Sequence, residues 1–112
     1  MIVAERGFAE KHGLQPLARL VSHSVAAVEP GMFGLGPIPA VQQALARAHW
    51  KTSDIDRVEI NEAFAAVVLS WAQVYKADLD KVNVNGGAIA LGHPVGSTGA
   101  RLITTALHEL ER

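Results

Sequence analysis

The sequence predicts an α/β domain, with a mostly parallel sheet and helices on both of its faces. Three observations lead to this fold class. Short runs with strand-like alternation are followed by longer runs whose apolar residues recur every three or four positions. Proline, glycine and aspartate mark the boundaries between these runs. No linker or internal repeat divides the chain, so we expect residues 1–112 to form one domain.

In the first third of the chain, the sequence predicts only one short helix. Residues 2–4 are expected to be the tail of a strand, and residues 5–11 a short helix that ends at Gly13. Partial alternation of apolar side chains over 17–28 predicts a strand. The glycine- and proline-rich residues 30–39 predict a loop that carries the chain over the edge of the sheet.

Two helices and a short strand follow. Pro39 is expected to begin a helix whose apolar stripe ends at Ala48, and residues 58–60 alternate as a short strand. Residues 63–77 predict a helix that is apolar on nearly all sides, which must therefore be buried between layers. Asn61 precedes this helix and either caps its first turn or has a catalytic role; the sequence leaves both open.

The glycine-rich stretch 81–101 organises the rest of the chain. It contains five glycines and, at its centre, His93, which Pro94 holds in an extended backbone conformation. From Ser97, expected to be a helix cap, apolar residues recur at helical spacing as far as Leu110. His93 is therefore presented from a loop, just before a helix begins.

Asn61 and His93 are the candidate catalytic residues. Each follows a predicted strand, and in parallel sheets ligands bind beyond the carboxyl ends of the strands. A carboxamide donor beside a neutral imidazole suits the stabilisation of an oxyanion, or the activation of an external nucleophile. Neither task is complete without that nucleophile. Ser97 does not supply it, because Val95 stands where a nucleophile elbow requires glycine.

The composition restricts partners, metal sites and compartment. A net charge of −1 argues against nucleic acid or an anionic membrane as a partner. The chain has no cysteine, and its five histidines lack the spacing of metal ligands on one helix face, so we expect no metal site. The start of the sequence lacks the apolar core of a signal peptide, and the longest apolar run, 63–69, is too short to span a bilayer. We expect a soluble, cytoplasmic protein.

Two motifs closely resemble the C-terminal half of thiolases, the acyl-CoA C-acyltransferases. They are Asn-Glu-Ala-Phe-Ala at 61–65 and Asn-Gly-Gly-Ala-Ile-Ala-Leu-Gly-His-Pro at 85–94, the latter continuing to Gly-Ala-Arg at 99–101. Shorter stretches are similar to thiolases in the same order: 13–14, 16–19 and 34–41. Ketosynthases share the wider superfamily and a similar Gly-His motif, but the Asn-Glu-Ala-Phe run favours a thiolase.

The resemblance implies roles for individual residues. His93 matches the histidine that activates the nucleophilic cysteine and contributes to an oxyanion hole, and Asn61 matches the asparagine that holds a water in that hole. Ala63, Phe64 and Gly92 are implied to lie at the substrate, near its pantetheine and acyl end. The implied reaction transfers acyl groups between acyl-CoA thioesters through an acyl-cysteine, by Claisen condensation or thiolysis. Coenzyme A thioesters are its substrates, and no cofactor is implied.

The sequence departs from the family pattern because both family cysteines are absent. The resemblance implies half of a thiolase-like fold, an incomplete C-terminal-type domain at 1–112 without its last two strands. We expect this chain alone to be inactive and to associate as a homo-oligomer or with an N-terminal thiolase half. The alternative is a non-catalytic module, of thiolase-like surface, for assembly or for binding CoA thioesters.

Overall fold

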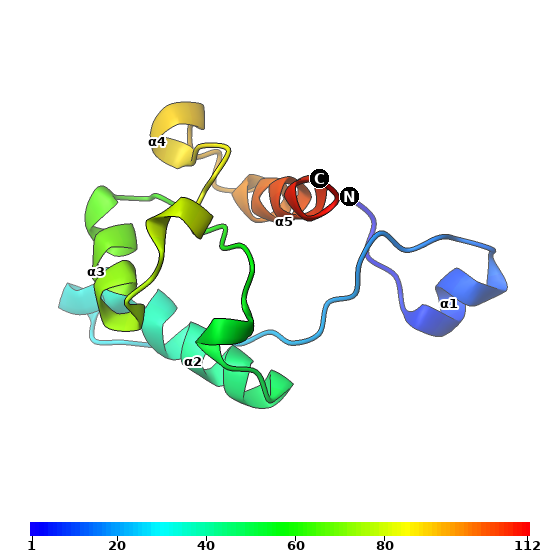
Figure 1. Ribbon diagram of the computed structural model, residues 1–112, viewed down its shortest axis with the longest axis horizontal. Coiled ribbons are helices and arrows are strands. Elements are labelled where there is room, and N and C mark those ends of the chain that lie inside the picture. The colour runs from blue at the N-terminus through cyan, green and yellow to red at the C-terminus, as the bar shows by residue number, and fades with distance from the viewer.

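The computed structural model describes residues 1–112 as helices joined by loops (Figure 1). The α-helices are α1 (Arg6–Lys11), α2 (Pro37–Ala48), α3 (Ala65–Tyr75), α4 (Ala88–Leu91) and α5 (Thr98–Leu110), and the 3₁₀ helices are η1 (Pro30–Leu35), η2 (Thr52–Asp54) and η3 (Leu79–Lys81). None of the helices is long and apolar enough to cross a membrane.

The parallel sheet expected from the sequence is not formed. The structure contains one parallel β-bridge, between Val58 and Val82. The predicted strand at 17–28 is irregular and has no ladder partner. It is bound instead to α2 by polar contacts: the Ser22 hydroxyl donates to the Ala44 carbonyl at 2.9 Å, and Arg47 donates to the His23 carbonyl at 2.7 Å. A strand pattern becomes a strand only where neighbouring backbone completes the ladder.

Helices are predicted better than strands. α1 ends close to Gly13, whose φ of +63° is the left-handed conformation that favours glycine. α2 begins at Pro37, two residues earlier than expected, and α5 follows Ser97 as expected. The Ser97 side chain, however, makes no capping bond. The proposed cap of α3 was wrong: Phe64 is its N-cap residue, so Asn61 lies outside the helix.

The best-packed part of the chain is the contact of α3 with η1 and α2. Val67 and Trp71 of α3 are buried there, and the Tyr75 hydroxyl donates to the Ile38 carbonyl at 2.7 Å. The opposite side of α3 is uncovered, since Leu69 is 61% exposed. The expectation that α3 is buried between layers is therefore met on one side only.

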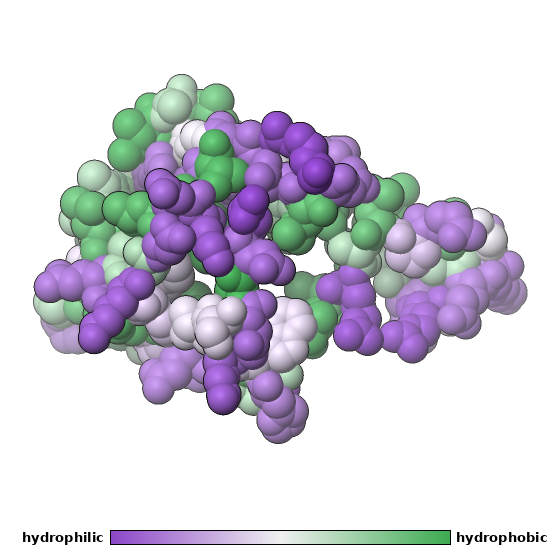
Figure 2. Space-filling model, viewed as in Figure 1, coloured by the Kyte–Doolittle hydropathy of each residue, from purple (hydrophilic) through white to green (hydrophobic).

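The molecule is open, with extents of 46 × 31 × 27 Å. Its radius of gyration is 15.1 Å, against about 13 Å for a compact domain of this length. Only six of the 112 residues are buried. Figure 1 shows α1 set apart from the other helices, and Figure 2 shows hydrophobic side chains gathered over α3 and α4. Exposed apolar surface of this kind marks a face that another structure covers.

Polar contacts tie the end of α5 to the neighbouring loops. The Glu109 carboxylate accepts hydrogen bonds from Arg57 Nε at 3.1 Å, Asn85 Nδ2 at 3.0 Å and Arg112 at 2.8 Å. These donors lower the pKa of Glu109 from its ordinary value. The hydrogen bond from Asn85 has the largest effect, and the hydrogen bond from Arg57 has the second largest. Glu109 therefore joins three segments in its charged form.

This contact predicts a pH dependence of stability. A carboxyl whose pKa is lowered by folding adds stability above its unfolded pKa, and that stability is lost as the pH falls through the folded pKa. We expect Glu109→Gln to lower the free energy of unfolding at neutral pH, and the difference from wild type to shrink below pH 4.5, the ordinary value. Urea unfolding of the variant and the wild type, from neutral pH to below pH 4.5, measures this difference in the free energy of unfolding. A difference that stays constant at all pH values would contradict the prediction.

Candidate active site

Two segments that carry the candidate residues are joined side by side. At the bridge, the Val58 amide donates to the Lys81 carbonyl at 2.9 Å, and the Asn83 amide donates to the Val58 carbonyl at 2.8 Å. The next rung uses a side chain: the Asn83 carboxamide accepts from the Ile60 amide at 2.9 Å and donates to the Ile60 carbonyl at 3.0 Å. Asn83 has a φ of +48°, a conformation that asparagine tolerates better than most residues. This pairing fixes the register between the two segments.

Glu62 extends the connection into the glycine-rich loop. Its carboxylate accepts from Asn83 Nδ2 at 2.9 Å and from the Ile89 amide at 2.9 Å. It lies against Gly87, where a Cβ atom would collide with it. Glu62 precedes α3 and binds two other segments. It positions the residue before it, Asn61.

Asn61 and His93 meet at the end of this arrangement. Asn61 Nδ2 lies 3.3 Å from His93 Nε2. The side chains come from loops 32 residues apart in sequence, as the sequence led us to expect. The Asn61 Oδ1 atom is buried and has no partner within the protein. The pair therefore offers one imidazole nitrogen and one carboxamide to a group placed beside them.

The other nitrogen of His93 is held by α5. His93 Nδ1 lies 2.8 Å from Thr98 Oγ1, and the Thr98 hydroxyl donates to the Pro94 carbonyl at 3.0 Å. Thr98 is the first residue of α5 and is 3% exposed. The ring is thus fixed by one contact on each side, although His93 as a whole is exposed.

Glu59, two residues before Asn61, is a carboxylate with a shifted pKa. Burial raises the pKa of Glu59, and the charge of Arg101 acts in the opposite direction. All three guanidinium nitrogens of Arg101 are buried without a hydrogen-bond partner in the protein, as is Glu59 Oε2. Glu59 and Arg101 therefore interact electrostatically without a direct hydrogen bond between them.

The remaining predicted site residues, Ala63, Phe64 and Gly92, are exposed. Ala63 and Phe64 follow Asn61 and are exposed, Phe64 by 61%. The Phe64 ring packs edge to face on Phe33, with ring centroids 6.1 Å apart. Gly92 ends α4 with a φ of +90°, which turns the chain toward His93. Ala63, Phe64 and Gly92 are adjacent in sequence to the pair, and their contact with a substrate is a proposal.

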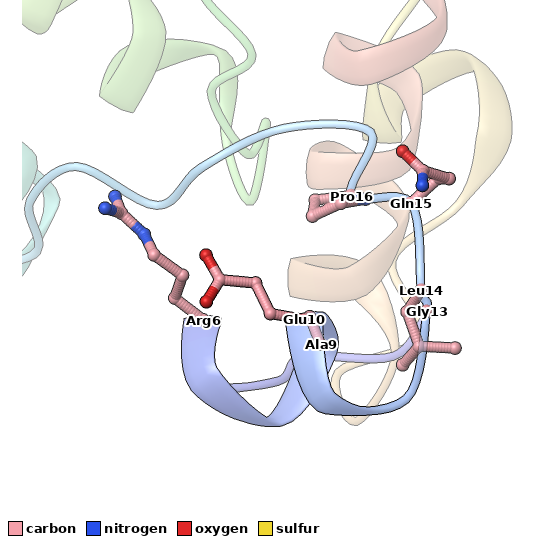
Figure 3. Close-up of a pocket in the computed structure, with 7 residues that line it drawn as sticks. All are labelled: Arg6, Ala9, Glu10, Gly13, Leu14, Gln15 and Pro16. Carbon is pink, nitrogen blue, oxygen red and sulfur yellow. The ribbon is translucent and has the colours of Figure 1, made fainter.

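One pocket lies at α1, away from the pair. It measures 510 Å³ and is lined by α1 and the residues that follow it, as far as Pro16 (Figure 3). A smaller pocket of 240 Å³ lies between η1 and α3 and includes Phe64 in its wall. No group of three or more histidine, aspartate or glutamate side chains is placed to hold a metal ion.

Sequence reasoning missed two residues of this arrangement. Thr98 stands five positions after His93, at the start of a predicted helix, where a threonine can reach back to the carbonyl four residues earlier. That spacing was visible in the sequence. Asn83 gave no such signal, because its role depends on pairing with a segment 23 residues away.

Comparison with known proteins places this arrangement in a family. The family model described as thiolase, C-terminal domain, matches residues 14–112. The cytosolic acetyl-CoA acetyltransferase of Mus musculus is 52% identical over 112 residues, which are 100% of this chain and 28% of that protein. The acetyl-CoA acetyltransferase of Cupriavidus necator is 49% identical over the same length and is likewise covered over 28%. The chain thus spans about 28% of the length of these curated relatives.

The solved structures agree with the sequence relatives. The crystal structure of human mitochondrial 3-ketoacyl-CoA thiolase matches with a TM-score of 0.93 and 45% identity, over 97% of this chain and 28% of that one. A crystal structure of the human mitochondrial enzyme in complex with CoA matches with a TM-score of 0.92 and 45% identity, over 96% of this chain and 27% of that one. The arrangement of helices and loops described above therefore occurs within larger solved proteins.

Proposed function

The chain belongs to the thiolase family, and from that membership we propose that it supplies the histidine and asparagine of an acyl-transfer site. The proposed reaction moves an acyl group between coenzyme A thioesters, by Claisen condensation or by thiolysis. The substrate is an acyl-CoA, and the reaction as proposed uses no metal or redox cofactor. The proposal concerns His93 and Asn61 as the groups that act on the thioester.

The contact between Asn61 and His93 is the observation that supports this proposal most directly. The two side chains lie within 3.3 Å of each other although 32 residues separate them. Two connections hold them there, the Asn83 pairing with Ile60 and the Glu62 bond to the Ile89 amide. Fixed groups that need no reorganisation are what transition-state stabilisation requires.

Each residue has a defined task in the proposed step. His93 Nε2 takes the proton of a cysteine thiol, and the thiolate attacks the carbonyl carbon of the thioester. The carbonyl oxygen gains negative charge, which the protonated Nε2 and the Asn61 carboxamide stabilise as hydrogen-bond donors. Collapse of the intermediate expels the coenzyme A thiolate, which recovers the proton and leaves an acyl-cysteine.

The nucleophile must come from outside these 112 residues, because the sequence contains no cysteine. We propose that a cysteine-bearing thiolase segment covers the exposed apolar side of α3 and α4. Such a partner would also supply strands beside the single Val58–Val82 bridge, which would build the parallel sheet that this chain does not form. It would exclude water from the exposed His93.

The test is a pair of activity measurements. We expect the purified chain with acetoacetyl-CoA and CoA to show no thiolysis above the blank, because an oxyanion-binding pair without a nucleophile forms no acyl-enzyme. We expect activity when the chain replaces the matching 112 residues of the Cupriavidus necator relative. Acetyl-CoA formation measures both. Turnover by the isolated chain would refute the need for an external nucleophile.

The second measurement separates the enzyme from the binding module. A folded chimera that binds acetoacetyl-CoA but does not turn it over would contradict the catalytic proposal. It would favour a thioester-binding role for this chain. The unmodified relative, purified and assayed in parallel, is the control for folding and assay sensitivity.

A further inference from the structure

We propose that Thr98 is a positioning residue that fixes His93 in the tautomer protonated at Nδ1. In this form Nε2 keeps its lone pair toward Asn61 and the proposed thiol. The inference deepens the proposed function, on which its catalytic meaning rests, but the tautomer itself is a property of the chain alone.

Both nitrogens of the ring lead to the same assignment. At Nε2, the facing atom is Asn61 Nδ2 at 3.3 Å, which carries only N–H donors, so Nε2 must be the acceptor. A neutral imidazole with an acceptor at Nε2 carries its proton at Nδ1. The Nδ1 proton then points at Thr98 Oγ1, 2.8 Å away.

The hydroxyl of Thr98 is able to accept this proton. A hydroxyl has one hydrogen, and that of Thr98 is directed at the Pro94 carbonyl, which can only accept, at 3.0 Å. The lone pairs of Oγ1 are therefore left for His93 Nδ1. The hydrogen bonds therefore form a chain in which Asn61 donates to His93, His93 donates to Thr98, and Thr98 donates to the Pro94 carbonyl.

The position of Thr98 makes this arrangement rigid. Its side chain is 3% exposed, so water does not compete for the hydroxyl. It is β-branched and stands at the first position of α5, where its hydroxyl bonds the carbonyl four residues earlier, a rotamer that helices favour for threonine. The Pro94 carbonyl also accepts the amides of Ser97 and Thr98, each at 2.9 Å, so that it is fixed by the start of the helix.

The tautomer matters because one nitrogen has two successive tasks. Nε2 must first accept the thiol proton and then, carrying it, donate to the oxygen of the developing oxyanion. With Nδ1 already protonated and bound to Thr98, both tasks fall to Nε2. In the opposite tautomer Nε2 is already protonated and cannot act as the base.

Nitrogen NMR of the chain labelled with ¹⁵N-histidine tests the assignment. At about pH 8 an ordinary histidine is neutral, and the two ring nitrogens then report which one carries the proton. We expect His93, identified by the signal lost in His93→Gln, to be protonated at Nδ1. A wild-type ring protonated at Nε2, with the Thr98 hydroxyl donating to Nδ1, would overturn the proposal without any Thr98 variant.

Variants of Thr98 test the cause. Thr98→Val keeps the shape and removes the hydroxyl, so we expect His93 to move to the Nε2-protonated form, and Thr98→Ser to restore the wild-type tautomer. Thr104→Val is the matched control, because Thr104 lies on the same helix and donates to the Ala100 carbonyl at 2.9 Å in the same way, but its recorded bond involves no histidine. A tautomer unchanged by Thr98→Val, in a protein of unchanged circular dichroism, would overturn the proposal.

The chimera gives the catalytic consequence separately. We expect Thr98→Val to lower kcat about tenfold with little change in KM, an effect in the range of residues that orient a functional histidine, and Thr98→Ser to recover it. An inactive chimera whose His93 is nonetheless protonated at Nδ1 would refute the proposed function and leave the positioning role of Thr98 intact. An active chimera with the Nε2 tautomer would support acyl transfer but refute both the positioning role of Thr98 and Nε2 of His93 as the base.

Discussion

Replacing His93 by alanine in the active chimera is expected to lower kcat by about 10²- to 10⁴-fold, the range for loss of a positioned acid or base. The substitution removes both the acceptor of the thiol proton and a donor to the oxyanion. Steady-state thiolysis of acetoacetyl-CoA measures the loss. We expect kcat and kcat/KM to fall together, because the missing interactions form only in the transition state.

Two comparisons make this result specific. His108→Ala is the control, since His108 lies in the last turn of α5, ten residues beyond Thr98, and its ring nitrogen Nδ1 lies 3.2 Å from the Glu111 carboxylate. Asn61→Ala removes one oxyanion donor and leaves the base, so its loss should be smaller, about 10²- to 10³-fold. A His93→Ala chimera that retains wild-type kcat would remove His93 from the mechanism.

The proximity of Asn61 and His93 was more predictable than the scaffold that holds them. The sequence placed Asn61 and His93 together by assuming that each follows a strand of one parallel sheet. They do meet, at 3.3 Å, but in this chain a single bridge and the Asn83 side chain replace the sheet. The turn residues and the spacing of motifs carry local information, whereas strand pairing depends on backbone from elsewhere.

The helices show the same division between local and distant causes. α5 begins where Pro94 and Ser97 indicated, because the signals for helix initiation lie within a few residues. Capping of the next helix was one of two roles left open for Asn61, but Glu62 is bonded to the Ile89 amide and the helix starts only after Phe64. That bond joins residues that are 27 positions apart in the sequence, so no local sequence pattern predicts it.

Gly87→Ala is expected to destabilise the chain by about 1.5–3 kcal/mol, the usual cost of losing hydrogen bonds to a charged group. The backbone of Gly87 is not the reason, because its φ of −124° and ψ of −161° are extended values that alanine adopts. The new Cβ would occupy the space of the Glu62 carboxylate, which must then leave Asn83 and the Ile89 amide. Urea unfolding measures the change in free energy.

A double-mutant cycle identifies the carboxylate as the cause. In a Glu62→Ala background the collision is absent, so adding Gly87→Ala should cost almost nothing, and the coupling between the two sites should approach the full cost of the single mutant. Gly99→Ala is the matched control, because no atom within 4 Å meets a Cβ at that position in α5 and alanine favours a helix. If Gly87→Ala were equally destabilising with and without the Glu62 side chain, the carboxylate would not be what fits against Gly87.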